Sequence, residues 1–157
     1  MSVALFRIDY RLLHWQTGVL WAKKLNADTI LVAGDAVAGN DMRRKLVLFS
    51  APADVDTRVL SLAETAAYLN SPEAAPHTVE LLVESTDDAL ALVQQVPALR
   101  SVNAALMKTL PGKKLLTKYL AADAHDLDNF RAMLALGARV ECYTVPTETP
   151  VSIEKYL

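Results

Sequence analysis

The sequence predicts an α/β fold in which helices cover both faces of a doubly wound sheet. Short apolar runs rich in Val, Ile and Leu alternate with longer segments whose apolar residues recur every three or four positions. Several of the short runs are continuously hydrophobic, which is typical of parallel strands that are covered on both faces. Parallel strands need helical crossovers of one hand, and the alternating order of elements supplies them.

Seven segments have the composition and length of strands. They begin near the N-terminus and recur throughout the chain, separated by segments long enough for a helix. The strands that we expect are Val3–Ile8, Thr29–Ala33, Thr57–Leu62, Thr78–Glu84, Arg100–Ala104, Leu115–Leu120 and Arg139–Val145.

Helix starts and stops fall between these strands. Ser61 and Glu64 have the spacing of a capping box, and Ser85 offers an N-cap for a helix that ends near Pro97. The apolar residues within 123–136 recur on one helical face, and Gly137 is placed to stop that helix.

The composition indicates a single domain that spans residues 1–157. The chain has 157 residues, of which 52% are hydrophobic, and this suffices for one full-sized core. Its 16 basic and 18 acidic residues give a formal net charge of -2, so no overall field favours a nucleic acid or an anionic membrane. We therefore expect no nucleic-acid partner and only local phosphate chemistry.

The cysteine content and the N-terminal sequence indicate a cytoplasmic protein. Cys142 is the one cysteine, so the chain forms no internal disulfide and no cysteine-rich metal cage. The apolar patch from Val3 to Phe6 is interrupted by Arg7 and Asp9 before it reaches the length of a signal peptide or a membrane span. Any role at a membrane is expected to be that of a peripheral partner.

The residues after the first strand form the most polar segment of the sequence. Between Arg7 and Gln16 lie two guanidiniums, a carboxylate, an imidazole and an amide. In a doubly wound sheet, ligands bind beyond the carboxyl ends of the strands, and the first strand is commonly central. An unprotonated imidazole such as that of His14 is a competent nucleophile, and arginines and helix N-terminal amides bind phosphate oxygens. The segment therefore suits phosphoryl transfer.

A purely structural interpretation of the same segment is also open. Arg7 and Asp9 would then form a surface ion pair, and His14 would cap or pack at a helix start. In the functional interpretation Asp9 would orient the imidazole of His14.

The segment Arg7-Ile8-Asp9-Tyr10-Arg11-Leu12-Leu13-His14-Trp15-Gln16 resembles the active-site signature of a known family. That signature, Arg-Ile-Asp-Asp-Arg-Leu-Ile-His-Gly-Gln, belongs to the IIB components of mannose/fructose/sorbose-type sugar phosphotransferase systems. The resemblance continues through Ile30-Leu31-Val32, Ser101-Val102-Asn103 and Gly112-Lys113 to Val145-Pro146, and so covers essentially the whole chain.

The resemblance implies a phosphocarrier. His14 would accept a phosphoryl group from a phosphohistidine of a IIA protein and deliver it to a sugar in a membrane IIC/IID complex. Arg11 and Asp9 would bind phosphate and orient the site, with Arg7, Tyr10, Trp15, Gln16 and Asp35 lining it or contacting phosphate. The family further implies a mostly parallel seven-stranded sheet whose last strand is antiparallel. No cofactor or metal is expected; a homo-oligomer is possible.

Three departures from the family pattern leave an alternative open. Tyr10 replaces the usual second aspartate, Trp15 replaces the glycine after the histidine, and Ala105-Leu106 replaces a Gly-Gly pair. Because glycine permits close backbone approach, these changes would reshape a phosphate cradle. The alternative is a divergent, non-catalytic regulatory or phosphate-binding relative with the same fold.

Other polar residues have simpler interpretations. His77 and His125 lack partners at metal-ligand spacing and are expected at the surface, and Cys142 is expected to be a small buried side chain. Asp35 contributes to the site or caps a helix. The basic run Arg43-Arg44-Lys45 either docks an acidic partner or forms a solvated helix face.

Overall fold

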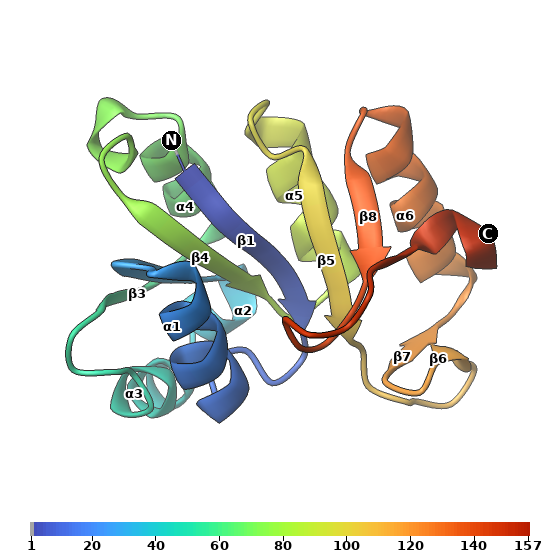
Figure 1. The fold of residues 1–157 in the computed structure, drawn as a ribbon, viewed down its shortest axis with the longest axis horizontal. Helices are drawn as coiled ribbons and strands as arrows, with labels where there is room; N and C mark the ends of the chain where they lie inside the picture. The colour runs from blue at the N-terminus through green and yellow to red at the C-terminus, as the bar shows by residue number, and fades with distance from the viewer. Residues whose placement is uncertain (1) are drawn as a thin grey trace.

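The computed structural model describes residues 2–157 and is built on a seven-stranded sheet of order β3-β2-β4-β1-β5-β8-β9 (Figure 1). Neighbouring strands are parallel, except that β9 runs antiparallel to β8. The predicted doubly wound sheet with an antiparallel last strand is thus confirmed. Its strands are β1 (Ser2–Asp9), β2 (Thr29–Ala33), β3 (Asp56–Leu60), β4 (Thr78–Val83), β5 (Ser101–Leu106), β8 (Arg139–Cys142) and β9 (Val151–Ser152).

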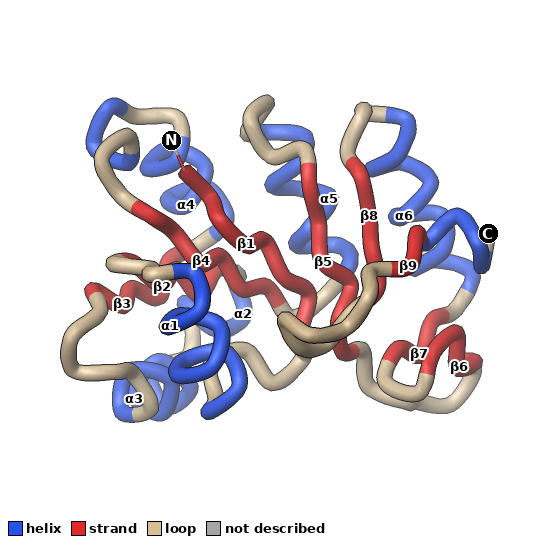
Figure 2. The backbone as a smooth tube through the Cα atoms, viewed as in Figure 1, coloured by secondary structure: helices blue, strands red, loops and turns tan. Residues whose placement is uncertain are grey.

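Helices lie on the two faces of this sheet (Figure 2). The side chains between the helices and the sheet form two separate cores. The larger core lies beneath α4 (Leu62–Leu69), α5 (Thr86–Gln95) and α6 (Ala124–Ala135). The smaller core lies beneath η1 (Gln16–Trp21), α1 (Ala22–Leu25), α2 (Asp35–Ala38) and α3 (Asp41–Phe49). Because side chains alternate along a strand, Leu31 enters the larger core while Ile30 and Val32 enter the smaller one.

Six of the predicted strands lie in the seven-stranded sheet, whereas the predicted strand 115–120 is divided by a turn between two short strands. Residues 115–120 do not join the sheet; they belong to a separate antiparallel hairpin of β6 (Lys114–Thr117) and β7 (Leu120–Ala122). The seventh strand is β9, which is only two residues long and carries too short an apolar pattern to be recognised. The expected strand 57–62 also ends early, because Ser61 leaves β3 to cap α4.

The helix-boundary predictions at Ser61, Ser85 and Gly137 are confirmed. The hydroxyl of Ser61 accepts from Glu64 N and the Glu64 carboxylate accepts from Ser61 N, as a capping box requires. Ser85 caps α5, and Gly137 at φ +85° terminates α6 in the left-handed conformation that glycine adopts without strain. Among the helices of residues 2–157, none has the length and apolarity needed to cross a bilayer.

Glu80 is a charged residue at the centre of the sheet. It lies in β4 between β1 and β2, its side chain is fully buried, and within residues 2–157 neither carboxylate oxygen has a hydrogen-bond partner. Burial raises the pKa of Glu80 to about 8, although the positive charge of Arg7 opposes that shift. The carboxyl group is therefore protonated in the folded protein at neutral pH.

This raised pKa predicts that Glu80 makes the fold less stable as pH rises. The unfolded chain ionises Glu80 near its ordinary value of 4.5 while the folded chain resists until about 8, so stability falls by ~1.4 kcal/mol per pH unit in that interval. We expect Glu80→Gln to match the wild type in urea unfolding at pH 4 and to exceed it increasingly up to pH 8. An identical stability difference at both pH values would contradict the buried, protonated carboxyl.

Candidate active site

The polar segment after β1 begins with a tight turn. β1 lies between β4 and β5, and the amide of Leu12 donates to the Asp9 carbonyl at 2.9 Å. Leu12 has φ +56°, a left-handed conformation that costs a non-glycine residue about 1–2 kcal/mol. Its side chain packs in the smaller core, which compensates for the strain and fixes the direction in which the chain reaches His14.

His14 caps the helix that follows it. Helical structure begins at Trp15, and the amide of Gln16 donates to His14 Nδ1 at 3.2 Å. In return, His14 N donates to Thr17 Oγ1 at 3.0 Å, and that hydroxyl donates to the Leu12 carbonyl at 3.0 Å. This exchange resembles a capping box in which the ring nitrogen of His14 takes the place of the N-cap hydroxyl and the hydroxyl of Thr17 takes the place of the carboxylate three residues later. The imidazole is thereby fixed relative to the turn.

The carboxylate of Asp9 is the centre of the site. Its side chain is fully buried and accepts hydrogen bonds from three residues: His14 through Nε2 at 3.1 Å, Arg7 through Nε and Nη2 at 3.2 and 3.1 Å, and Arg11 through N, Nε and Nη2 at 3.0 to 3.2 Å. Burial alone would raise the pKa of Asp9, but the hydrogen bonds from His14 and Arg11 and the charge of Arg7 outweigh burial and hold that pKa well below its usual value. Asp9 is therefore ionised under all ordinary conditions.

Arg7 is buried beneath this carboxylate with all five N–H donors engaged. Nε and one Nη2 hydrogen go to Asp9, the other Nη2 hydrogen goes to Gln16 Oε1 at 2.7 Å, and Nη1 donates to Asn103 Oδ1 at 3.3 Å and to the Thr144 carbonyl at 2.8 Å. Burial lowers the pKa of Arg7, although Asp9 opposes that shift. Arg7 thus orients Asp9 and Gln16 and has no donor left for a phosphate.

Arg11 lies above Asp9, at the surface. Its side chain is 34% exposed, and it uses Nε and Nη2 to bind Asp9 while Nη2 also donates to Gln16 Oε1 at 3.0 Å. Within residues 2–157, Nη1 of Arg11 has no hydrogen-bond partner. One side of this guanidinium is therefore available to an incoming anion.

The remaining predicted site residues have different environments in the structure. The side chains of Tyr10 and Trp15 are exposed, with exposed fractions of 41% and 68%. The carboxylate of Asp35 instead accepts from the amide of Leu62 at 2.9 Å, which joins α2 to the start of α4. Asp35 is the first residue of α2 rather than its N-cap, which is Gly34.

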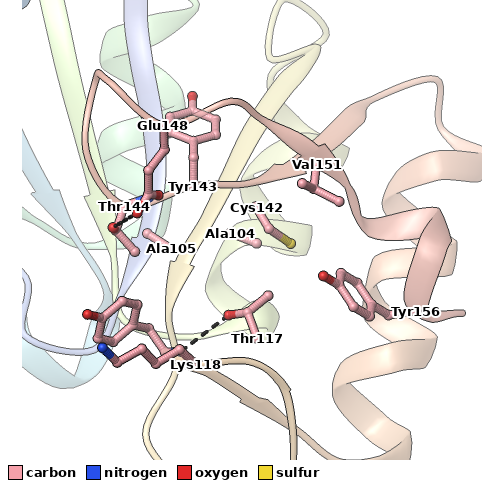
Figure 3. A pocket seen from close by; sticks show the side chains of 11 residues that line it. Ala104, Ala105, Thr117, Lys118, Cys142, Tyr143, Thr144, Glu148, Val151 and Tyr156 are labelled. Carbon is pink, nitrogen blue, oxygen red and sulfur yellow. Dashed lines mark hydrogen bonds between the residues drawn. The ribbon is translucent and has the colours of Figure 1, made fainter.

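The segment that follows β8 borders the site. A hollow of about 360 Å³, shown in Figure 3, is lined in part by Cys142, Tyr156, Tyr119, Thr144 and Glu148. The last three also line an adjacent hollow of about 390 Å³ that reaches Arg11 and Gln16. His14 lines neither of these two hollows, and its own side chain is 20% exposed.

Three positioning residues were not identified from the sequence. Thr17 links the helix start to the turn, Asn103 binds Arg7, and the carbonyl of Thr144 accepts from both Arg7 and Trp21 Nε1. An asparagine within an otherwise apolar strand was a usable signal for Asn103. A carbonyl contact such as that of Thr144 has no signal, because every residue has a carbonyl.

Cys142 and the other two histidines lie apart from this cluster. Cys142 is buried in β8, and burial raises its pKa to about 11, which disfavours the thiolate that a nucleophilic cysteine needs. His77 contacts Asp28 at 3.1 Å, and His125 contacts Asp87 at 2.7 Å. These contacts are those of partly or fully exposed side chains, as predicted.

Comparison with known proteins identifies the family. The model of the sorbose-subfamily IIB component of the phosphotransferase system matches residues 3–157. The chain belongs to this family. The resemblance inferred from the Arg7–Gln16 segment is thereby confirmed, and the chain is a phosphotransferase-system IIB component.

Named relatives and a solved structure agree with this family. The sorbose-specific EIIB component of Klebsiella pneumoniae is 33% identical over 98% of this IIB component and 93% of its own length. The mannose-specific EIIAB component of Escherichia coli is 32% identical over 94% of this chain, which covers only 46% of that longer protein. The crystal structure of the IIBSor domain of the Klebsiella pneumoniae sorbose permease has a TM-score of 0.92 and 33% identity, covering 99% of this chain and 95% of that one.

The geometry predicts that the two arginines of this IIB component differ in their contribution to stability. Arg7→Met would leave the buried Asp9 carboxylate, Gln16, Asn103 and the Thr144 carbonyl short of donors, and we expect a loss of ~3–5 kcal/mol. Arg11→Ala removes a partly exposed ion pair and should cost about 1 kcal/mol. Urea unfolding at pH 7 measures both. Equal losses in the two variants would contradict the assignment of Arg7 as the structural partner.

Proposed function

We propose that this IIB component carries a phosphoryl group on Nδ1 of His14. The group would come from a phosphohistidine of a IIA protein and pass to a sugar held by a membrane IIC/IID complex, with the IIB component acting at the cytoplasmic face as one domain over residues 1–157. The observation that supports this most directly is the orientation of the His14 ring between Asp9 and the Gln16 amide.

That orientation assigns the proton on the imidazole. A carboxylate only accepts hydrogen bonds, so the ring nitrogen that faces Asp9, Nε2, must carry the hydrogen. A backbone amide only donates, so the nitrogen that faces Gln16 N, Nδ1, must present its lone pair. The nucleophilic atom in this proposal is therefore Nδ1, and Asp9 keeps the ring in the tautomer that leaves Nδ1 unprotonated.

The transfer step exchanges one N–P bond for another. The lone pair of Nδ1 attacks phosphorus in line with the donor nitrogen, the donor N–P bond breaks, and its electron pair returns to the donor imidazole. The His14 ring gains positive charge as the new bond forms, and the ionised Asp9 beside Nε2 stabilises that charge. Passage to a sugar hydroxyl follows the same course: the N–P bond to His14 breaks and its electron pair returns to Nδ1, the sugar oxygen bonds to phosphorus, and the hydroxyl proton passes to water.

Two groups are placed to hold the phosphoryl oxygens. Once Nδ1 is bonded to phosphorus, the amide of Gln16 loses its acceptor and becomes free to donate to a phosphoryl oxygen at the helix N-terminus. Arg11 offers Nη1 from the adjoining turn, an atom without a hydrogen-bond partner among the described residues. Arg7 and the Gln16 side chain support these groups indirectly, and Asp35 has a structural contact elsewhere.

The exposed aromatic residues are the parts of the site that we assign to protein contact. The side chains of Tyr10 and Trp15, which are near His14 in the sequence, are exposed to solvent, and aromatic side chains are enriched where proteins meet. The departures from the family pattern at positions 10 and 15 leave the hydrogen bonds of the His14 ring intact, because these are made to Asp9 and to the Gln16 amide. The departures at these two positions are thus compatible with transfer.

Phosphorylation by a matched IIA protein and its upstream donors tests the proposal. We expect an acid-labile, base-stable addition of one phosphoryl group that maps to His14, with a nitrogen-phosphorus coupling to Nδ1 in nuclear magnetic resonance spectra. His14→Ala should remove it, while His77→Ala, which changes a histidine far along the sequence, should retain it. Absence of label in the folded wild type would favour the non-catalytic alternative, and label in His14→Ala would refute the acceptor.

The geometry of Arg11 predicts a separation of activity from stability. In Arg11→Lys a single ammonium replaces a guanidinium that binds Asp9 with Nε and Nη2 while leaving Nη1 for phosphate. We expect the rate of single-turnover transfer from phosphorylated IIA to fall ~10- to 100-fold, equivalent to about 1.4–2.7 kcal/mol of lost transition-state stabilisation. Rapid-quench kinetics measure the rate and urea unfolding measures stability, which should change by under about 1 kcal/mol. Unchanged transfer would remove Arg11 from the phosphate site.

A further inference from the structure

Helix α3 has an unusual surface for a helix of a folded domain. It is nine residues long, yet none of its side chains is fully buried. Met42, Leu46 and Phe49 follow one another at spacings of four and three residues, so they share one helical face. Their exposed fractions are 68%, 61% and 91%. We call these three residues the α3 stripe.

The rest of α3 is firmly attached, so the stripe has a defined orientation. Val47 packs against the smaller core, and Arg43 Nη2 donates to Glu84 Oε2 at 2.6 Å at the end of β4. The side chain of Asn40 caps the first turn by accepting from Arg43 N at 3.0 Å. These contacts anchor one side of the helix and leave the apolar stripe on a side directed away from the core.

The stripe continues into the phosphoryl site. A groove of about 190 Å³ runs between α3 and the turn before His14, with Leu46 and Arg43 on one wall and Tyr10 and Arg11 on the other. Figure 1 shows α3 next to the helix that follows His14. A protein that covers His14 on this side therefore meets Tyr10, then Leu46, and then the remainder of the stripe.

The charges near the α3 stripe favour a partner protein with an acidic surface. Arg44 and Lys45 lie on α3 with no carboxylate partner within residues 2–157, and Arg11 stands at the mouth of the groove. A donor that arrives with a phosphoryl anion gains from these cations, whereas a permease presenting an uncharged sugar does not. The positive charge near the stripe thus favours the phosphoryl donor over the permease, although both proteins must approach His14.

We propose that the α3 stripe and its groove are the docking surface for the phosphoryl donor, a IIA protein that presents an apolar patch edged by acidic side chains. This inference rests on the proposed phosphocarrier function and names the surface through which that function begins. Three apolar anchors along one exposed helical face are the usual means by which a helix enters a partner's groove. The stripe would be covered only while donor and carrier are together.

Transfer kinetics from phosphorylated IIA test the proposal with the intact chain. The test variant is Leu46→Gln with Phe49→Gln, and the matched control is Leu115→Gln, which alters a 60% exposed leucine on the β6–β7 hairpin. We expect the double variant to raise the KM for phosphorylated IIA ~10- to 100-fold, because central apolar anchors dominate protein interfaces. The rate at saturating donor should stay within about twofold of the wild type, and the control should match the wild type in both constants.

Direct chemical phosphorylation separates docking from chemistry. Phosphoramidate, a small donor, should label His14 equally in the wild type and the double variant. Failure to label the wild type would overturn the proposed function itself, whereas an unchanged KM for phosphorylated IIA would overturn only the docking surface. A defect confined to onward transfer into membrane vesicles would assign the stripe to the permease, and loss of a wild-type dimer with unchanged donor kinetics would assign it to a second copy of the chain; either result refutes the proposal.

Discussion

The buried carboxylate of Asp9 is the interaction on which the site depends. Isolating a negative charge at the end of a central strand is costly, and the chain compensates with donors from Arg7, Arg11 and His14. Each of those donors belongs to a different part of the site: Arg7 to the sheet, Arg11 to the turn, and His14 to the helix start. Satisfying Asp9 therefore fixes the positions of all three together. A carboxylate that served only as an electrostatic partner would not need so many contacts.

In the proposed mechanism, the Nδ1 atom of His14 has two functions that succeed one another. In the unmodified protein it accepts from the Gln16 amide and so completes the cap of η1. In the proposed phosphorylated state the same nitrogen would be bonded to phosphorus, and the phosphoryl oxygens would take over as acceptors for the freed amide. The helix is capped in both states, so the change of state requires little rearrangement. The structural and functional interpretations of His14 are thus compatible.

Features of the fold and of the site could be predicted from the sequence where neighbouring residues specify them. The caps at Ser61 and Ser85 and the stop at Gly137 were predictable because turn and cap chemistry involves only neighbouring residues. The polar segment from Arg7 to Gln16 was identifiable for the same reason. The placement of Asp35 was not, because its bond to Leu62 joins residues 27 positions apart. The short β9 was missed because its two residues are specified by pairing with β8, not by their own pattern.

An exposed site above a rigid base suits a carrier better than an enclosed pocket would. An enzyme that acts on a small molecule gains from excluding water, but a carrier must admit one protein surface to load the phosphoryl group and another to release it. Here the rigid contacts lie below the ring, where Asp9 and Arg7 are fully buried, while the ring itself and Arg11 stay partly exposed. Selectivity must then come from surfaces around the ring, not from a cavity. Tyr10, Trp15 and the α3 stripe are large apolar groups placed where such surfaces would meet, which explains why a stable fold leaves them in water.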